Sequence, residues 1–488
     1  MGVFFSMKLL SRSIAVCVFI VFLMGAQLEV DAAQHGPNIV FIIADDLRYD
    51  LLGCNGHPHV RTPNIDRLAA EGANFTQAFA TTPLCSPSRA SFLTGLHTHQ
   101  HHIVNNDGQG LHVLSHRLMT FPRILREEAD YETAYIGKWH MGFDDTRRPG
   151  FDHWISFKGQ GQFVDPVVII DDERKQTDGY LTDLISDWAV EFVEQDHERP
   201  FCLFLSHEAV HYPFLPAERH EDLYNDVEVP EPVVDEASLR GKVALTREMP
   251  EPATPLWFEL PDASPERAEP RRGRPNDLET VVRDQLRCLT AVDEGIGRLY
   301  EVLERKGILD KTIVIFTSDQ GYLHGEYGLI RQKRWPYDPS LRIPLVVRYP
   351  ALISPGTQVD DMVLSLDIAP TLLELAGVEW DTPFDGRSLI TKLQKPESLW
   401  RDSFLFEYFV EKITPHCPTY FGVRTSDWKY VHYPELEGAD ELYHLAEDPD
   451  ERTNVAHNPA HADELARMRK ELLRLNRATE NPFAMSLP

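Results

Sequence analysis

Positive charge is scarce in this chain of 488 residues. It carries 48 lysines and arginines against 76 aspartates and glutamates, which gives a formal net charge of −28 at pH 7. A field of this sign repels polyanions, so nucleic acid is excluded as a partner. A small anionic substrate would have to be attracted locally, by basic side chains gathered in one cleft beside a metal ion.

Long hydrophobic runs are also missing, apart from one near the N-terminus. Ile14 to Gly25 is apolar but too short to span a bilayer. Lys8 and Arg12 precede it and Val30-Asp31-Ala32 follows it, a pattern typical of a secretory signal peptide and its cleavage site. We therefore expect residues 1–32 to be a signal peptide. The mature protein is expected to be exported, periplasmic or secreted, and to have no stable membrane anchor.

Cysteine is rare as well, with six in the chain. One of them, Cys17, lies in the predicted signal peptide, and the odd number that remains indicates one special thiol in an exported protein. Cys85 is the candidate for that thiol. We expect a buried free thiol at Cys202, because it lies in an apolar run. The sequence leaves open any disulfide pairing among Cys54, Cys202, Cys288 and Cys417.

Apolar runs and helical periodicities alternate along the chain, without internal repeats. Runs typical of strands buried on both faces of a sheet occur at 38–44, 201–206 and 311–318. Helical periodicity closed by glycine covers 62–72, 278–307 and 365–377. Strands that alternate with helices predict an α/β fold.

Changes in composition suggest the domain boundaries. We expect a catalytic domain over 33–395, interrupted at 225–276 by a surface insertion that is rich in Pro and Glu and lacks either periodicity. Whether this insertion is an inert loop or faces the substrate stays open. A smaller α+β subdomain is expected over 396–488, with strands at 404–409, 420–424 and 428–433 and a terminal helix at 460–477.

Polar residues follow the first and the last of the predicted strands. Asp45 and Asp46 come directly after the first, and Asp319 and Gln320 come directly after the last. Ligands bind at the carboxyl ends of strands in open α/β sheets, so these side chains are expected to share one site. These side chains offer only oxygen atoms as ligands and no soft ligand such as a thiolate. A ligand set of this kind selects calcium or magnesium over zinc or copper.

The segment from Leu84 to Gly95 carries the most specific signal. Pro87 favours an extended backbone at Ser86, and the residues after Pro87 suit the first turn of a helix. Cys85 should therefore lie at a helix N-terminus, where free backbone N–H groups stabilise bound anions. The C-x-P-S-R pattern and its Ala-x-x-x-Thr-Gly extension resemble the type I sulfatases of the alkaline-phosphatase-like superfamily. The resemblance implies that a formylglycine-generating enzyme or an equivalent maturase oxidises Cys85 to formylglycine.

Further motifs of this family lie along the chain from about Pro37 to about Asn454. They are Gly137-Lys138-Trp139-His140, similar to the G-K-W-H element, His211-Tyr212-Pro213, similar to the H-x-P turn, and Lys333, at the second sulfate-lysine position. The resemblance implies a large mixed, mostly parallel sheet sandwiched by helices, with a smaller C-terminal α+β domain. Many members carry Asn or His where Gln320 stands. The resemblance also implies one calcium ion, held by Asp45, Asp46, Cys85, Asp319 and Gln320.

The mechanism that the resemblance implies is covalent hydrolysis of a sulfuric ester. Hydrated formylglycine at position 85 would attack sulfur in line, and calcium together with Lys138, Lys333 and Arg89 would stabilise the anionic oxygens. A thiol could not replace formylglycine, since a thiol has no second hydroxyl to drive elimination. We therefore expect a sulfatase whose substrate is a sulfated carbohydrate.

Histidines would move the protons in this mechanism. His211, in a loop that Pro213 makes rigid, would protonate the leaving alcohol, and His140 would take a proton from the remaining hydroxyl to expel sulfate. His207 fits a structural hydrogen-bonding role as well as a ligand role. No thiol or carboxylate completes a tetrahedral set for a zinc site at His97, His99, His101 and His102.

Two other functions stay open. A phosphate or phosphonate ester hydrolase of the same superfamily is the nearest, and Ser88 favours a sulfatase over it. The second is a catalytically inactive protein that binds sulfated glycans, which the intact Cys85, Arg89, Lys138 and His140 oppose. Candidates for contact with the sugar are Arg331, Arg334, His324 and His416.

Overall fold

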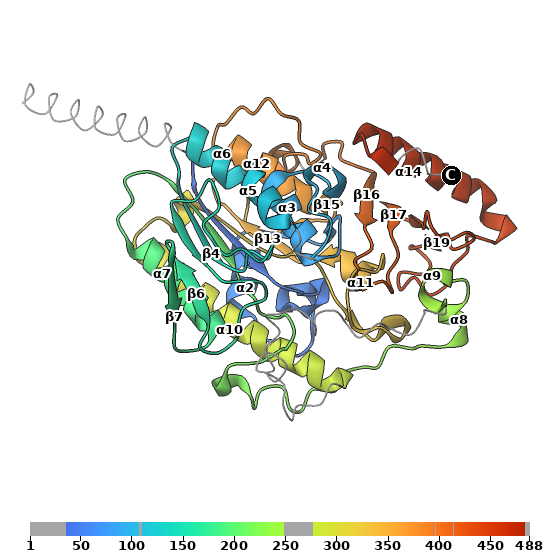
Figure 1. The fold of residues 1–488 in the computed structure, drawn as a ribbon, viewed down its shortest axis with the longest axis horizontal. Coiled ribbons are helices and arrows are strands. Elements are labelled where there is room, and N and C mark those ends of the chain that lie inside the picture. The colour runs from blue at the N-terminus through green and yellow to red at the C-terminus, as the bar shows by residue number, and fades with distance from the viewer. Residues whose placement is uncertain (1–35, 107–109, 248–276, 396, 413, 484–488) are drawn as a thin grey trace, which may run out of the picture.

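A ten-stranded sheet forms the centre of the molecule (Figure 1). The computed structural model describes residues 36–106, 110–247, 277–395, 397–412 and 414–483. The predicted signal peptide and residues 248–276 of the predicted insertion lie outside the described residues. From edge to edge the strands are β14 (Thr357–Val359), β2 (Ala73–Phe75), β13 (Leu345–Arg348), β9 (Thr312–Ser318), β1 (Asn38–Ala44), β8 (Phe201–Ser206), β4 (Glu132–Gly137), β5 (His153–Ser156), β6 (Val167–Ile170) and β7 (Glu173–Gln176).

The middle of this sheet is parallel. Strands β9, β1, β8, β4 and β5 run in one direction, and β13 and β6 join them as antiparallel neighbours. Strands β8 and β9 are buried along their whole length, which accounts for their unbroken apolar sequences. The predicted α/β class with a large mixed, mostly parallel sheet is confirmed.

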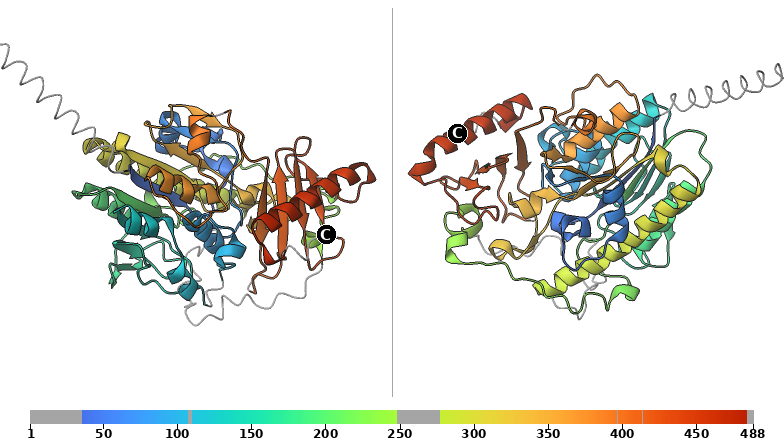
Figure 2. Two further views of the ribbon diagram at one scale, coloured as in Figure 1. Left: turned by 90° about the horizontal axis from the view of Figure 1, so that it is seen from above. Right: turned by 180° about the vertical axis from the view of Figure 1, so that it is seen from behind.

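Helices cover both faces of the sheet (Figure 2). Alternate residues of a strand point to opposite faces, so Ile39 and Phe41 enter one core while Val40 and Ile42 enter the other. The first core contains residues of α3 (Cys85–Thr94), α6 (Phe121–Glu128) and α12 (Ile368–Leu375). The second contains residues of α2 (Pro63–Glu71), α7 (Leu181–Glu194) and α10 (Leu278–Arg305). The predicted helices are thus confirmed as α2, α10 and α12. Helices α2 and α12 are shorter at both ends than expected, whereas α10 begins at Leu278 as expected and is shorter only at its C-terminal end.

The C-terminal part forms a separate antiparallel sheet (Figure 1). Its four strands are β16 (Ser403–Tyr408), β17 (Tyr420–Thr425), β18 (Trp428–His432) and β19 (Glu441–His444). Met468 and Leu472 of α14 (Ala462–Ala478) pack on this sheet. The sequence predicted the first three strands and the helix. It did not predict β19, because four residues are too few to show an alternating pattern.

The first part of the predicted insertion contacts this C-terminal sheet. Its short helices α8 (Glu236–Leu239) and α9 (Val243–Thr246) flank Lys242, which is fully buried. The Lys242 ammonium donates to the Tyr443 hydroxyl and, at 2.7 Å, to the Glu451 carbonyl. These contacts anchor residues 236–246 to the C-terminal part of the chain.

The cysteines within the described ranges form no disulfide. The free thiols are those of Cys54, Cys85, Cys202, Cys288 and Cys417. The prediction that Cys202 is a buried free thiol is therefore confirmed. None of the pairings that the sequence left open is formed.

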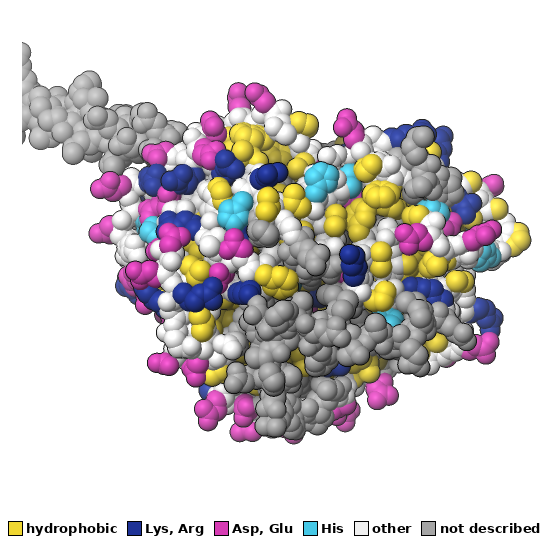
Figure 3. Space-filling view, viewed as in Figure 1, with side chains coloured by type: hydrophobic (Ala, Val, Ile, Leu, Met, Phe, Trp, Pro, Cys, Tyr) yellow, Lys and Arg dark blue, Asp and Glu magenta, His cyan; other side chains and the backbone are white. Residues whose placement is uncertain are grey.

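On the face of the molecule shown in Figure 3, the described residues form no patch of a single charge. Lysine and arginine side chains are interspersed there with aspartate and glutamate side chains.

In the part of the chain that the structure describes, no helix has both the length and the apolar sequence needed to cross a membrane.

Candidate active site

Neighbouring strands end at one edge of the central sheet, and polar residues follow each of them. These residues are Asp45 and Asp46 after β1, Asp319 and Gln320 after β9, His207 and Glu208 after β8, and Lys138 after β4. Parallel neighbours bring their carboxyl ends together, so residues far apart in the sequence meet here. The Asp46 backbone N–H, for example, donates to Asp319 Oδ1 at 3.1 Å.

Cys85 is the first residue of α3 and faces these strand ends. Leu84 before it is extended, and the Ser88 N–H donates to the Leu84 carbonyl at 2.9 Å, so the helix begins where the sequence predicts. The Cys85 side chain is fully buried. Burial, aided by the negative charge of Asp45, raises the pKa of the Cys85 thiol to about 12. The side chain is therefore a neutral thiol at neutral pH, and an unmodified thiolate nucleophile is disfavoured.

Two buried lysines bring positive charge to Cys85. Lys333, directly after β11 (Ile330–Gln332), places its Nζ 2.8 Å from Cys85 Sγ and 2.5 Å from Asp46 Oδ1. Lys138 forms an ion pair with Asp45. Positive charge buried beside a helix N-terminus makes this position suited to an anionic group.

Arg89, on the second turn of α3, contacts two of the carboxylates. Its Nη2 lies 3.0 Å from Asp45 Oδ2, and its Nε lies 3.0 Å from Asp319 Oδ2. Its Nη1 donates to the Lys138 carbonyl at 2.9 Å and to Ser206 Oγ at 2.6 Å. Burial alone would raise the pKa of Asp45, but the charges of Lys138 and Arg89 hold this pKa well below its ordinary value. Asp45 is thus ionised and fixed in position.

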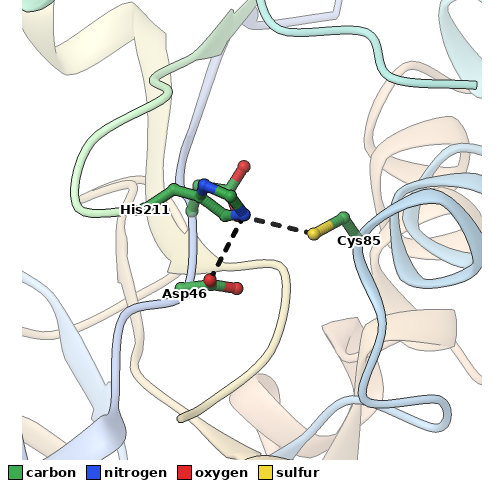
Figure 4. Close-up of side chains that lie close together, drawn as sticks. Asp46, Cys85 and His211 are labelled. Atoms are coloured by element: carbon green, nitrogen blue, oxygen red, sulfur yellow. Dashed lines mark hydrogen bonds and ion pairs between the residues drawn. The ribbon is translucent and has the colours of Figure 1, made fainter. Parts of the chain in front are cut away.

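The imidazole ring of His211 points toward Cys85 and Asp46 (Figure 4). Its Nε2 lies 3.6 Å from Asp46 Oδ2, and its Nδ1 lies 2.7 Å from the Tyr212 carbonyl oxygen. Burial and the charges of Lys138 and Lys333 lower the pKa of His211 well below its ordinary value. The ring is therefore neutral in this state of the site.

His140 approaches the same site from the loop after β4. Its Nε2 lies 3.2 Å from the side-chain nitrogen of Gln160, whose side-chain oxygen accepts a hydrogen bond from Lys138. Burial and the positive charge of Lys138 lower the pKa of His140 well below its ordinary value. A neutral, buried imidazole beside a lysine can accept a proton from a neighbouring hydroxyl.

Oxygen donors gather beside Cys85 in an arrangement that fits a cation. Ligand atoms of Asp45, Asp46, Cys85 and His211 all lie within 4.8 Å of one another. Asp46 Oδ2 and Gln320 Oε1 are buried and have no hydrogen-bond partner among the described residues. Buried oxygens of this kind suit a hard cation, which takes carboxylate and amide oxygens as ligands. The group is therefore a candidate metal site that contains Cys85.

The sequence did not predict two residues of this site, Glu208 and Gln160. Glu208 lies two positions beyond the end of β8, as Asp46 lies two beyond the end of β1. The rule that found the Asp46 carboxylate would therefore have found Glu208 as well. Gln160 lies in the loop between β5 and β6, where no strand end or motif indicates a role.

The remaining histidines lie outside this group. His207 is fully buried, both of its ring nitrogens lack a hydrogen-bond partner in the described chain, and burial lowers its pKa to about 3. His99 binds Glu407 at 2.9 Å and His101 contacts Ser91 Oγ at 3.1 Å. Within the described ranges, no group of side chains other than the one at Cys85 has the geometry of a metal site.

Arg331, one of the residues considered for sugar contact, lies beside the loop that carries His211. The guanidinium of Arg331 lies 5.7 Å from the centre of the Tyr212 ring. Arg334 pairs with Glu411 through its Nε at 2.5 Å. His324 is buried, with its Nε2 2.6 Å from Gln285 Oε1.

Two family matches cover most of the chain. Residues 37–378 match the family described as Sulfatase. Residues 325–478 match the region described as N-sulphoglucosamine sulphohydrolase, C-terminal. The chain therefore belongs to the sulfatase family, and it is a sulfuric ester hydrolase.

Individual relatives are similar to this chain along most of their length. An N-acetylglucosamine-6-O-sulfatase of Bacteroides thetaiotaomicron is 34% identical, over 92% of this chain and 87% of the relative. The solved structure of a protein in complex with its substrate D-glucosamine-2-N,6-O-disulfate is 31% identical with a TM-score of 0.79, covering 92% of this chain and 99% of that one. A phosphonate monoester hydrolase of Agrobacterium radiobacter is 25% identical with a TM-score of 0.69, covering 91% of this chain and 96% of that one. The alkaline-phosphatase-like fold predicted from the sequence is thus confirmed.

Proposed function

We propose that the protein removes sulfate from a sulfated saccharide, and that a 6-O-sulfated glucosamine unit is its substrate class. The observation that carries this proposal is the surroundings of Cys85, which lies at a helix N-terminus between the ammonium group of Lys333 and the carboxylate of Asp45. The names of the two relatives at 34% and 31% identity support the choice of sugar. The predicted signal peptide supports a location outside the cytoplasm, with the protein either periplasmic or secreted.

We propose calcium as the metal of this site, because its buried carboxylate and amide oxygens are ligands that calcium prefers. Asp45, Asp46, Asp319, Gln320 and the residue at position 85 would hold it. When bound, calcium would act as a Lewis acid that draws negative charge from the sulfate oxygens. Arg89 would hold Asp45 and Asp319 in place for this ion, since its guanidinium contacts both carboxylates.

Formylglycine, formed from Cys85 by a maturase, would supply two hydroxyl groups when hydrated, one to attack sulfur and one whose deprotonation releases sulfate. Lys333 and Lys138 would neutralise charge on the sulfate oxygens. His211 would give a proton to the sugar oxygen as the sulfur–oxygen bond breaks. His140 would take the proton that residue 85 loses. Each of these groups lies in or directly beside the cluster at Cys85.

A phosphonate or phosphate ester hydrolase is the second candidate, because the hydrolase of Agrobacterium radiobacter shares the fold at 25% identity. The first test compares sulfate release from 6-O-sulfated N-acetylglucosamine with hydrolysis of a nitrophenyl phosphate and a phenylphosphonate monoester. We expect the sulfate ester to give the highest kcat/KM, and Cys85→Ala to abolish its turnover. Faster hydrolysis of either phosphorus ester would overturn the proposal. Wild-type protein that binds sulfated glycans but lacks an aldehyde at residue 85 would favour the inactive binding protein.

A further inference from the structure

Glu208 lies between two residues of the site, Lys138 and His211. Its side chain is 1% exposed. Its Oε2 lies 3.1 Å from Lys138 Nζ, and its Oε1 lies 3.5 Å from His211 Nδ1. Apart from its ion pairs with Lys138 and His211, the carboxylate has no hydrogen-bond partner among the described residues. Burying a carboxylate without hydrogen bonds is costly, so its retention at this position calls for a role in the site.

The orientation of the His211 ring indicates what that role is. Nδ1 lies 2.7 Å from the Tyr212 carbonyl oxygen, which can only accept, so Nδ1 carries the hydrogen of the neutral ring. Nε2 then faces Asp46 and Cys85 (Figure 4). Burial raises the pKa of Glu208, but the Lys138 ammonium at 3.1 Å favours the ionised form. The ionised carboxylate places its negative charge on the Nδ1 side of His211, where it favours this tautomer and this orientation.

Lys138 depends less on Glu208 than His211 does. It also pairs with Asp45 and donates to Gln160, so two polar partners remain if Glu208 loses its charge. The acidic groups that contact His211 are Asp46 at Nε2 and Glu208 at Nδ1. Loss of the Glu208 charge would therefore remove the ion pair on the Nδ1 side of the ring and leave the hydrogen bond to the Tyr212 carbonyl.

We propose that Glu208 is a positioning residue that holds the His211 ring with Nε2 aimed at the oxygen of the leaving sugar. The inference rests on the proposed function, in which His211 gives its proton to that oxygen. An alkyl sugar is a poor leaving group and needs the proton, whereas an activated nitrophenol barely does. The contribution of Glu208 should therefore depend on the leaving group.

The test uses Glu208→Gln, which keeps the size of the side chain and removes its charge. On 6-O-sulfated N-acetylglucosamine, kcat should fall by about 10-fold or more with little change in KM. On 4-nitrophenyl sulfate, kcat should fall by no more than about 3-fold. The matched control is Glu294→Gln, because Glu294 also contacts a histidine, His220 at 2.9 Å, outside the site. This control should leave both rates unchanged, and thermal unfolding should show that both variants are folded.

A double variant identifies the residue through which Glu208 acts. In the His211→Ala background, Glu208→Gln should cause no further loss on the sugar sulfate, because the group that it positions is gone. An equal loss on both esters that persists in this background would show that Glu208 acts through Lys138 and would overturn the inference. Unchanged kinetics on both esters would overturn it too. If the wild-type protein releases sulfate from neither ester, the proposed function itself is wrong, and the inference is wrong with it.

Discussion

The ammonium nitrogen of Lys333 lies 2.8 Å from the sulfur of Cys85, although the two residues are 248 positions apart in the chain. In the proposed mechanism, this contact would hold a buried positive charge beside the sulfate group that residue 85 attacks. Charge stabilisation by one fixed donor in a water-excluded site is worth on the order of 3 kcal/mol in a transition state. The sulfate is common to every substrate, so this contribution should not depend on the leaving group.

Lys333→Met should lower kcat/KM on 4-nitrophenyl sulfate and on 6-O-sulfated N-acetylglucosamine by similar factors, about 10²- to 10³-fold. The reason is that the variant removes charge from the sulfate and not from the leaving oxygen. Lys175→Met is the matched control, because Lys175 lies on the edge strand β7 with about half of its side chain exposed. A loss confined to the sugar sulfate would contradict the assignment of Lys333 to the sulfate.

Cys85 should be found as formylglycine in active enzyme. Peptide mass analysis should detect the aldehyde at residue 85, while Cys54 in the same digest remains a thiol. Cys85→Ala should unfold within a few degrees of the wild type and show no measurable turnover, since it removes a nucleophile rather than a large packing group. Active material with only an unmodified thiol at residue 85 would show that the modification is not needed.

Calcium should stabilise the wild-type protein. A ligand at 100 times its dissociation constant adds about 2.7 kcal/mol to the free energy of unfolding, so removal of calcium by a chelator should lower Tm and abolish turnover. Asp46→Asn should weaken this response, because it removes the charge of a carboxylate whose Oδ2 has no hydrogen-bond partner among the described residues. Asp196→Asn, on a fully exposed side chain, should respond as the wild type does. Stoichiometric zinc without calcium in purified enzyme would rule out the calcium assignment.

The sequence predicted the parts of the site that depend on local patterns. The buried strands end at Ala44 and Ser318, and apolar runs reveal such ends without any knowledge of the tertiary fold. Pro87 marks the start of α3 in the same way. These two signals were sufficient to predict a shared site for the carboxylates and a helix N-terminus at Cys85. The resemblance to the type I sulfatases was needed to place Cys85 beside the carboxylates.

The contacts that the sequence did not predict join segments that are distant in the chain. Gln160 reaches Lys138 and His140 only because β4 and β5 are neighbours in the sheet. Lys242, in a segment without periodicity, becomes buried because Tyr443 and Glu451 bind its ammonium group. Neither contact leaves a pattern in the residues around it, so tertiary structure was needed to find them.

His99 joins the catalytic part of the chain to the C-terminal sheet. It lies on α4 (Thr98–His101), and its Nδ1 is 2.9 Å from Glu407 Oε1 on β16. Its Nε2 is 3.0 Å from the Thr479 carbonyl oxygen. Burial alone would lower the pKa of His99, but the charge of Glu407 and the hydrogen bonds raise it above its ordinary value. This raised pKa links protonation of His99 to the stability of the protein.

The sign of the pH dependence follows from the direction of the shift. Because the folded-state pKa of His99 lies above the unfolded value of about 6.5, its protonation contributes stability that is fully present below the unfolded pKa. That contribution is lost as the pH rises through the folded pKa. His99→Gln should therefore lower Tm more at about pH 5.5 than at about pH 9, by roughly 2 °C in differential scanning calorimetry. In the Glu407→Gln background the larger loss of Tm at about pH 5.5 should disappear or change sign, because burial then lowers the pKa of His99 without the opposing charge of Glu407. An effect of His99→Gln that is equal at both pH values in the wild-type background would show that His99 acts there as a neutral hydrogen-bonding group alone.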